Sequence, residues 1–461
     1  MSERSTQSTL KAKPQAGHLD PRGVPISACD PSSLADFETA LIQFESFFGD
    51  PTETLQVTLE RDPEFVLGHI FCANAMLLMT ERQYLPAIRE SLDKANKLSA
   101  KSNSREKSLI AAAQAMLDGH WVRASTIWDQ VLAEYPRDAL ALQSAHLLDF
   151  YLGDAVNLRD RISRVMGHWD KGLPNYSYIL GMQAFGLEEC NEFGLAEDTA
   201  LAALDIERRD PWCLHALTHV FEMQNRYREG QTLLTSRVDD WAPDNGFAFH
   251  NWWHLGLFYL EREDYASALE LYDEKIAPQE SDISLEILDA SALLWRLQLQ
   301  GQNVGPRWSA VVDAWSKKTA IENGYYAFND LHAVMALVGS GRIESAREVL
   351  AAVQDAAQSN VGVTRRMAAD IGIPTCSAFI AFGEERYDDA IDALYPIRSI
   401  AHRFGGSHAQ RDVLTQTLLE AAIRAGRCGL VENLINERKV HKPSSPLTQR
   451  FQHKLQATRL D

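Results

Sequence analysis

Four histidines occur as two pairs whose spacing suits metal binding. His215 and His219 lie in WCLHALTHVFEMQNRYREG, and His250 and His254 lie in FHNWWHLGLFYLEREDYASA, so four of the chain's 14 histidines fall within 40 residues. Residues four apart on a helix share one side, with Cβ atoms about 6 Å apart. Imidazole is a ligand for zinc, iron, copper and nickel ions. Two such pairs on neighbouring helices could therefore hold a transition-metal ion as a cofactor.

Other interpretations of these four histidines remain open. The pattern is not the HExxH signature of metalloproteases, because Ala216 and Asn251 stand where that signature has glutamate. Glu222, one turn after His219, could complete a ligand set or act as a general base. The same imidazoles could instead hydrogen-bond a small ligand in a groove, or a neighbouring carboxylate or tyrosine as part of ordinary packing. Phosphate-binding glycine loops and a nucleophile elbow are absent from the sequence.

The helices that carry these pairs belong to an internal repeat. After a short polar turn, a bulky residue is followed three positions later by a small one, as in QNRYREG and REDYASA. Such anchors stand at positions 84, 121, 155, 193, 227, 265, 304, 343, 387 and 428, with spacings of 34 to 44 residues near the tetratricopeptide (TPR) period. Alternating strand patterns are lacking. We predict an all-α, TPR-like α-α superhelix (solenoid) of roughly ten helical hairpins with a long concave surface.

The repeat register predicts which side chains face the concave surface. Counting back from the anchors at Tyr227 and Tyr265 puts both histidine pairs on the inner face of the first helix of each unit. Residues four apart in both helices then converge, because neighbouring helices lie about 10 Å apart. The residues predicted to share this face are Trp212, His215, His219 and Glu222 in one unit, His250, Trp253 and His254 in the next, and Tyr178, Phe185, Glu188 and Glu189 in the unit before.

Two further polar segments carry candidate residues. In YYAFNDLHAVMALVGSGR, Asp330 and His332 open a helix, where an aspartate could orient the imidazole or simply favour the helix dipole. In HRFGGSHAQRDVL, Arg411 and Asp412 near a helix start could cap the helix, pair with each other or bind an anionic ligand.

The composition of the chain disfavours some classes of binding partner. The 461-residue chain carries a net charge of −18, which argues against nucleic acid and anionic membranes as main partners. Six scattered cysteines without a CxxC pair favour a reducing compartment, so we expect a cytoplasmic protein. There is no run of 18 apolar residues, so we expect no membrane insertion. The polar N-terminus predicts a flexible leader over residues 1–34, and the repeat domain then spans 35–461.

The polar residues also carry a resemblance to a known family. HALTHVFEMQNRYREG, FHNWWHLGLFYLEREDYASALELYD, YAFNDLHAVMAL and GGSHAQRDV together resemble the tetratricopeptide repeat protein 38 family over roughly residues 35 to 455. The resemblance implies an all-helical repeat protein and assigns no activity. The matching positions are His215, His219, Glu222, His250, Asn251, Trp253, His254, Asp330, His332, Gln410, Arg411 and Asp412.

Three functions are consistent with these observations. The first is binding of a small polar molecule or peptide in the concave groove, through Trp212, His215, His219, Glu222, His250, Trp253, His254, Asp330, His332 and Arg411. The second is an enzyme in which His215, His219, His250 and His254 hold a metal ion, or act with Glu222 as general acid and base. The third is a protein interaction scaffold in which the histidines have no special role.

Overall fold

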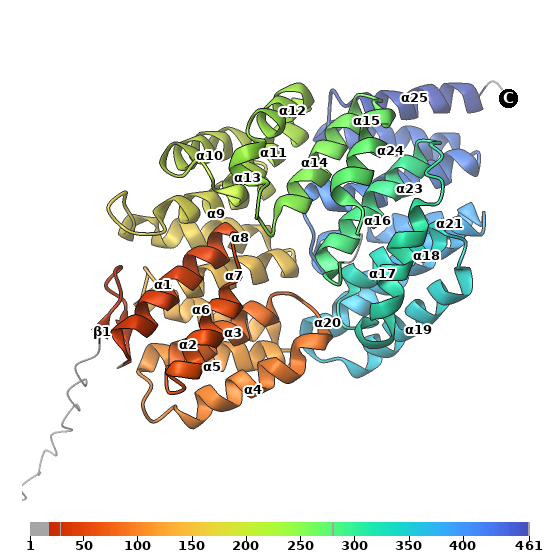
Figure 1. Cartoon of the computed structure of the whole chain (residues 1–461). Coiled ribbons are helices and arrows are strands. Elements are labelled where there is room, and N and C mark those ends of the chain that lie inside the picture. The colour runs from red at the N-terminus through yellow and green to blue at the C-terminus, as the bar shows by residue number, and fades with distance from the viewer. Residues whose placement is uncertain (1–17, 28, 279–280, 460–461) are drawn as a thin grey trace, which may run out of the picture.

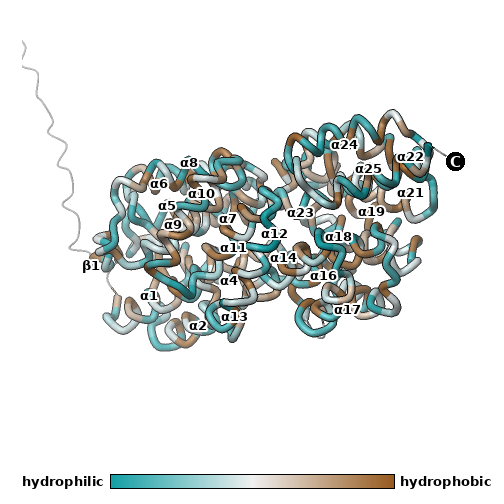
Figure 2. Tube along the Cα trace, turned by 90° about the horizontal axis from the view of Figure 1, so that it is seen from above, coloured by the Kyte–Doolittle hydropathy of each residue, from teal (hydrophilic) through white to brown (hydrophobic). Residues whose placement is uncertain are grey.

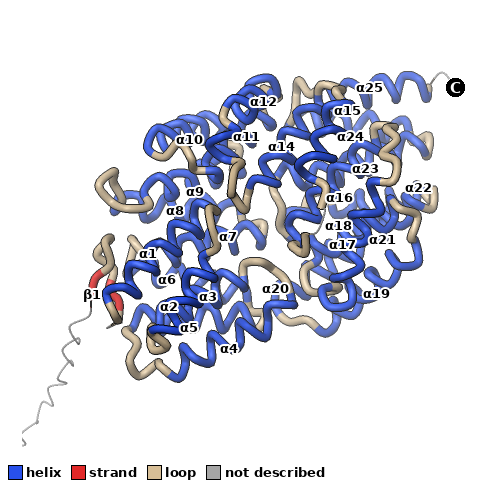
Figure 3. The backbone as a smooth tube through the Cα atoms, viewed as in Figure 1, coloured by secondary structure: helices blue, strands red, loops and turns tan. Residues whose placement is uncertain are grey.

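The chain folds almost entirely into helices, as Figure 3 shows. The computed structural model describes residues 18–27, 29–278 and 281–459. In this part of the chain no helix combines the length and the apolar character that a membrane span requires. The helices are α1 (Pro31–Ser46), α2 (Pro51–Arg61), α3 (Val66–Leu77), α4 (Leu85–Lys97), α5 (Ser104–Leu117), α6 (Trp121–Glu134), α7 (Ala139–Leu152), α8 (Ala155–Val165), α9 (Tyr176–Glu189), α10 (Phe193–Ile206), α11 (Pro211–Met223), α12 (Tyr227–Ser236), α13 (Val238–Trp241), α14 (Ala248–Glu261), α15 (Tyr265–Leu271), α16 (Ser284–Leu299), α17 (Arg307–Glu322), α18 (Ala327–Gly339), α19 (Ile343–Ser359), α20 (Gly362–Arg366), α21 (Ile373–Gly383), α22 (Tyr387–Leu394), α23 (His408–Arg424), α24 (Cys428–His441) and α25 (Pro446–Thr458).

The predicted anchors stand at the start of the second helix of each pair. Eight of them are the first residues of α6, α8, α10, α12, α15, α19, α22 and α24. Tyr84 directly precedes α4, and Val304 lies three residues before α17. Ten helix pairs therefore run from α3–α4 to α23–α24, with α1 and α2 before them and α25 after them. The prediction of an all-α, TPR-like superhelix is confirmed.

Small residues three positions after the anchors allow the second helix of one pair to approach the first helix of the next pair closely. Ala124 and Ala268, each three positions after an anchor, are fully buried. At Gly230 of α12 an added Cβ would lie 2.2 Å from the ring of Phe258 on α14. A contact of that length is a steric clash, so even alanine would push α12 away from the helix that carries His250 and His254.

The superhelix closes on itself, so much of its inner surface is packed rather than open. Figure 1 and Figure 2 show two halves side by side with α14 where they meet, and α11 contacts both α14 and α23. The turn after α3 reaches across to the second half, where Glu81 accepts a hydrogen bond from the Ser284 backbone N–H at 2.8 Å and pairs with Lys318 at 2.5 Å. Glu322 accepts hydrogen bonds from the backbone N–H groups of Arg82 and Gln83. These contacts turn the predicted long concave groove into an enclosed interior.

The N-terminal boundary differs from the prediction. Residues 1–17 of the predicted leader lie outside the described residues, but residues 18–26 form an antiparallel hairpin of β1 (His18–Leu19) and β2 (Pro25–Ile26). Arg22 in this hairpin is buried and pairs with Asp20 and Glu38, each at 2.7 Å. The predicted leader therefore includes folded residues, because this arginine anchors the hairpin to α1, which itself begins at Pro31.

Candidate metal centre

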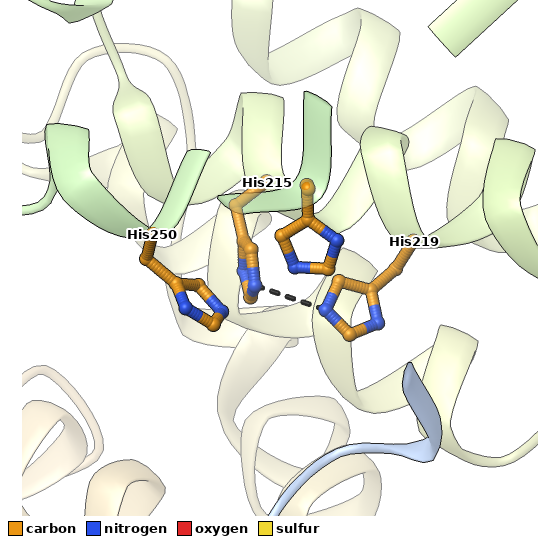
Figure 4. Close-up of side chains that lie close together, drawn as sticks. His215, His219 and His250 are labelled. Atoms are coloured by element: carbon orange, nitrogen blue, oxygen red, sulfur yellow. Dashed lines mark hydrogen bonds between the residues drawn. The ribbon is translucent and has the colours of Figure 1, made fainter. Parts of the chain in front are cut away.

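Helices α11 and α14 bring the four histidines together. Asp210 caps α11 by accepting a hydrogen bond from the Cys213 N–H at 3.0 Å, and Pro211 occupies the first turn. These two residues fix the start of the helix, four residues before His215. In Figure 4 the labelled rings of His215, His219 and His250 point toward one another. His215, His219, His250 and His254 form the imidazole cluster, and the ring centroids of five of its six pairs lie 4.4 to 5.0 Å apart.

The ring nitrogens of the imidazole cluster are spaced as ligands of one ion would be. One nitrogen from each ring lies within 4.8 Å of the other three, and the Nε2 atoms of His215 and His219 are 2.9 Å apart. A tetrahedral ion with metal–nitrogen bonds of about 2.0–2.1 Å holds its ligand nitrogens about 3.3 Å apart. The nitrogen atoms of the cluster are thus close enough together to be ligands of one ion.

The imidazole cluster is buried, not exposed on a groove. His219 and His254 have no exposed surface, and His215 and His250 are 2% and 7% exposed. Burial lowers the pKa of His219 to about 4, and burial together with the neighbouring imidazoles lowers the pKa of His215 and of His254 well below the ordinary value. These three rings are therefore neutral near pH 7, which is the form that binds metal ions.

Carboxylates hold the outer nitrogens of two rings. His250 Nδ1 lies 2.6 Å from Asp289 Oδ2 on α16, and His254 Nδ1 lies 3.2 Å from Glu222 Oε2 on α11. Lys442, after the end of α24, pairs with the other oxygen of Glu222 at 3.1 Å. A carboxylate that accepts Nδ1–H fixes the ring and leaves Nε2 free to bind. In agreement, His254 Nε2 is buried without a hydrogen-bond partner.

Aromatic side chains enclose the imidazole cluster. Trp253 stacks on His250 with ring centroids 5.3 Å apart and planes 13° apart, and Trp212 lies 5.1 Å from His215. Phe185 and Phe247 pack against His215 from two other sides, at 5.2 and 5.1 Å. Both predicted tryptophans are thus beside the histidines, but they are buried and form walls of the centre rather than an exposed stacking surface.

Glu188, Glu189 and Arg411 lie on the far side of His219. Glu188 Oε2 is 3.4 Å from His219 Nδ1. Glu189 accepts a hydrogen bond from the His408 backbone N–H at 2.8 Å and faces Arg411 at 3.3 Å. Arg411 therefore joins the edge of the site, although it does not cap its helix.

Arg411 and Asp412 do not pair with each other, which was one of the three alternatives that the sequence left open, and neither caps the helix. Ser407 and Gln410 form the capping box of α23, and Asp412 pairs with Arg438 of α24 instead. Adjacent residues on a helix point in different directions, so each finds a partner on a different neighbouring helix.

Asp330 and His332 are not part of the imidazole cluster, and the aspartate does not orient the imidazole. Asp330 accepts a hydrogen bond from the Gly324 N–H at 2.9 Å, and His332 Nδ1 donates to the Phe328 carbonyl at 2.8 Å. Two residues apart on α18, their side chains face different directions. Both serve local structure at the start of this helix.

Acid is expected to destabilise the metal-free protein partly through His332. Burial lowers its pKa to about 4, against about 6.5 in an unfolded chain. Between these values the unfolded chain binds a proton that the folded chain excludes, so stability falls as the pH falls, by about 1.4 kcal/mol per pH unit. His332→Gln should flatten the dependence of the unfolding free energy on pH by one proton, measured by urea unfolding with chelator present. His453→Gln, at an exposed histidine, is the control, and an unchanged slope in His332→Gln contradicts the expectation.

Two residues of the site escaped the sequence analysis. Asp289 lies 15 residues before the anchor at Val304, which is the spacing of Trp212 and His250 from their own anchors. The same register count would have placed it on the inner face. Lys442 offered no such signal, because it reaches Glu222 only through the closure of the superhelix, 220 residues along the chain.

A cavity of about 840 Å³ opens beside the site. It lies between α7 and α8 of the first half and α23 and α24 of the second. Its wall is mostly apolar, with Phe150, Leu158 and Leu414 among the lining residues. Glu189, Arg411 and Lys442 line it on the side of the imidazole cluster. A volume of this size suits a small organic molecule.

Comparison with known proteins finds no matching family model. Among solved structures, the human IFIT1 dimer with m7Gppp-AAAA shares 13% identity at a TM-score of 0.43, covering 94% of this chain and 96% of that one. Yeast Tom70 shares 12% identity at a TM-score of 0.41, covering 89% of both chains, and the P58(IPK) TPR domain shares 12% at 0.22, covering 86% of this chain and 99% of that one. With such low scores, the fold assignment rests on the helix pairs of this chain itself.

Proposed function

We propose that this protein binds a transition-metal ion in the imidazole cluster. The observation that carries the proposal is the convergence of four buried imidazoles, two of which are held from behind by carboxylates. The ion would bind the inner nitrogens of His215, His219, His250 and His254. An all-nitrogen ligand set suits zinc, copper, iron or nickel.

Packing alone accounts poorly for this arrangement. Buried polar atoms normally have hydrogen-bond partners, and each one without a partner costs free energy. Within the imidazole cluster His254 Nε2, His215 Nδ1 and His219 Nδ1 have none, whereas the Nε2 atoms of His215 and His219 form a hydrogen bond with each other. A bound cation supplies one partner for several lone pairs at once.

Glu222 supports the ion from outside in this proposal. Its two oxygens already face His254 and Lys442, so its role is to orient an imidazole rather than to act as a general base. Glu222 therefore lies between the imidazole of His254 and the ammonium group of Lys442.

The neighbouring cavity favours a second function, the binding of a small molecule next to the metal ion. The cavity touches the site through Glu189 and Lys442, and its apolar wall would cover the body of an organic ligand. The four histidines themselves do not line the cavity, so such a ligand would contact Glu189 and Lys442 rather than the imidazoles. The ligand-binding and metal-binding hypotheses meet at these two residues.

Metal analysis tests the proposal. Protein purified without a histidine tag and saturated with Zn²⁺, then desalted, should retain at least one equivalent of metal. The double variant His219→Ala plus His254→Ala should retain none at the imidazole cluster. The matched control is His146→Ala plus His332→Ala, which removes two equally buried histidines outside the cluster and should leave the metal content unchanged. Circular dichroism checks that each variant folds. Wild-type protein that retains no Zn²⁺, Cu²⁺, Ni²⁺ or Co²⁺ contradicts the proposal.

A further inference from the structure

We propose that a second metal ion binds on the opposite side of His219, between its Nδ1 atom and the carboxylates of Glu188 and Glu189. The ring of His219 would then bridge two ions, one at each nitrogen. This inference rests on the proposed function, because Nε2 of the same ring belongs to the imidazole cluster.

The three residues are arranged as a ligand set. Glu188 and Glu189 are the last two residues of α9, which packs beside α11. One oxygen from each carboxylate and one nitrogen of His219 all lie within 4.8 Å of one another, and all three residues are buried. Mixed carboxylate and imidazole ligands suit zinc, iron and other divalent transition metals.

Glu188 is a buried carboxylate without a partner. It has no exposed surface, and neither of its oxygens has a hydrogen-bond partner. The 3.4 Å from Glu188 Oε2 to His219 Nδ1 does not form a hydrogen bond, and Nδ1 is likewise without a partner. Asp289 and Glu222, by contrast, each hydrogen-bond the Nδ1 atom of their histidine. The space between Glu188 and His219 is therefore one that an ion would complete.

The protein supplies no positive side chain for Glu188. Within the described residues, no lysine or arginine pairs with it, whereas Glu222 has Lys442 and Glu189 has Arg411. Burying a carboxylate requires a proton, a hydrogen-bonded cation or a metal ion. A proton shared between Glu188 Oε2 and His219 Nδ1 would leave the other Glu188 oxygen without a partner, whereas a metal ion can bind the carboxylate and the ring nitrogen together with Glu189.

Glu189 connects this second site to the cavity. It lines the cavity, and its position is held by the His408 backbone N–H and by Arg411. The second ion would thus be the one accessible to a molecule in the cavity, while the first ion stays enclosed by aromatic rings. Binding of both ions takes both ring nitrogens of His219 as ligands, so the neutral ring gives up its single N–H proton to the solvent and bridges as an imidazolate.

A metal titration tests the inference. Metal-free wild-type protein should take up two equivalents of Cu²⁺, and the two spins, coupled through one ring, should give a weakened electron paramagnetic resonance signal. Glu188→Gln keeps the shape of the side chain but weakens it as a ligand, so it should take up one equivalent with a full, uncoupled signal. Glu45→Gln, at another buried glutamate away from the cluster, is the matched control and should behave as wild type.

The outcomes separate the two proposals. One equivalent in both wild type and Glu188→Gln would overturn the second ion and leave the imidazole cluster as a single site. Two equivalents that persist in Glu188→Gln without loss of coupling would also overturn it. No uptake by wild type would overturn both. Replacement of Glu188 by Gln without any change in metal count, but with greater stability, would identify Glu188 as a protonated structural group.

Discussion

Zn²⁺ added to metal-free protein is expected to raise the free energy of unfolding by about 4 kcal/mol when free Zn²⁺ is a thousandfold above its Kd. The reason is that the four imidazoles converge only in the folded chain, so Zn²⁺ binds the folded state much more tightly than the unfolded state. The gain should vanish in acid, because protons compete for the ring nitrogens. Chemical denaturation with and without chelator measures the effect.

Two controls make this stabilisation specific. Mg²⁺ should have no effect, because it prefers oxygen ligands in octahedral geometry and the inner ligands here are nitrogens. His219→Ala plus His254→Ala should abolish most of the Zn²⁺ effect, while His146→Ala plus His332→Ala should preserve it. An equal gain in all three proteins would assign Zn²⁺ binding to surface groups and contradict the proposed centre.

Glu81→Ala is expected to lower the free energy of unfolding by about 3–5 kcal/mol. Glu81 and Lys318 are both buried, at 1% and 4% exposure, and join the first helix pairs to α17. Removing the carboxylate leaves the buried ammonium group of Lys318 without its ion-pair partner and the Ser284 N–H without its hydrogen-bond acceptor. Urea unfolding of the metal-free protein measures the loss.

The control for Glu81 is an exposed pair of the same type. Lys94 and Glu90 are 2.8 Å apart on α4 with most of both side chains in solvent. Glu90→Ala should therefore leave the free energy of unfolding nearly unchanged, because exposed ion pairs contribute little. The double change Glu81→Met plus Lys318→Leu should recover much of the loss, because it leaves no buried charge unpaired. A loss in Glu81→Ala as small as in Glu90→Ala would show that the two halves close without this contact.

The sequence determined the fold class and the convergence of the histidines. Bulky anchors followed by small residues mark the start of each second helix, because only a small side chain lets helices approach as α12 and α14 do at Gly230. Once the anchors at Tyr227 and Tyr265 set the register, helix geometry alone placed His215 with His219 and His250 with His254 on facing sides. These are local rules, and they required no knowledge of distant contacts.

Only the tertiary structure decided that these residues are buried and what surrounds them. A register count says that a side chain faces inward, but it does not say whether the superhelix closes. Closure depends on pairs far apart in the chain, such as Glu81 with Lys318 and Glu222 with Lys442, 237 and 220 residues apart. Closure replaced an open groove with an enclosed centre and left Glu188 buried without a partner. Sequence periodicity carries no information on such contacts, because they arise from the curvature summed over many repeats.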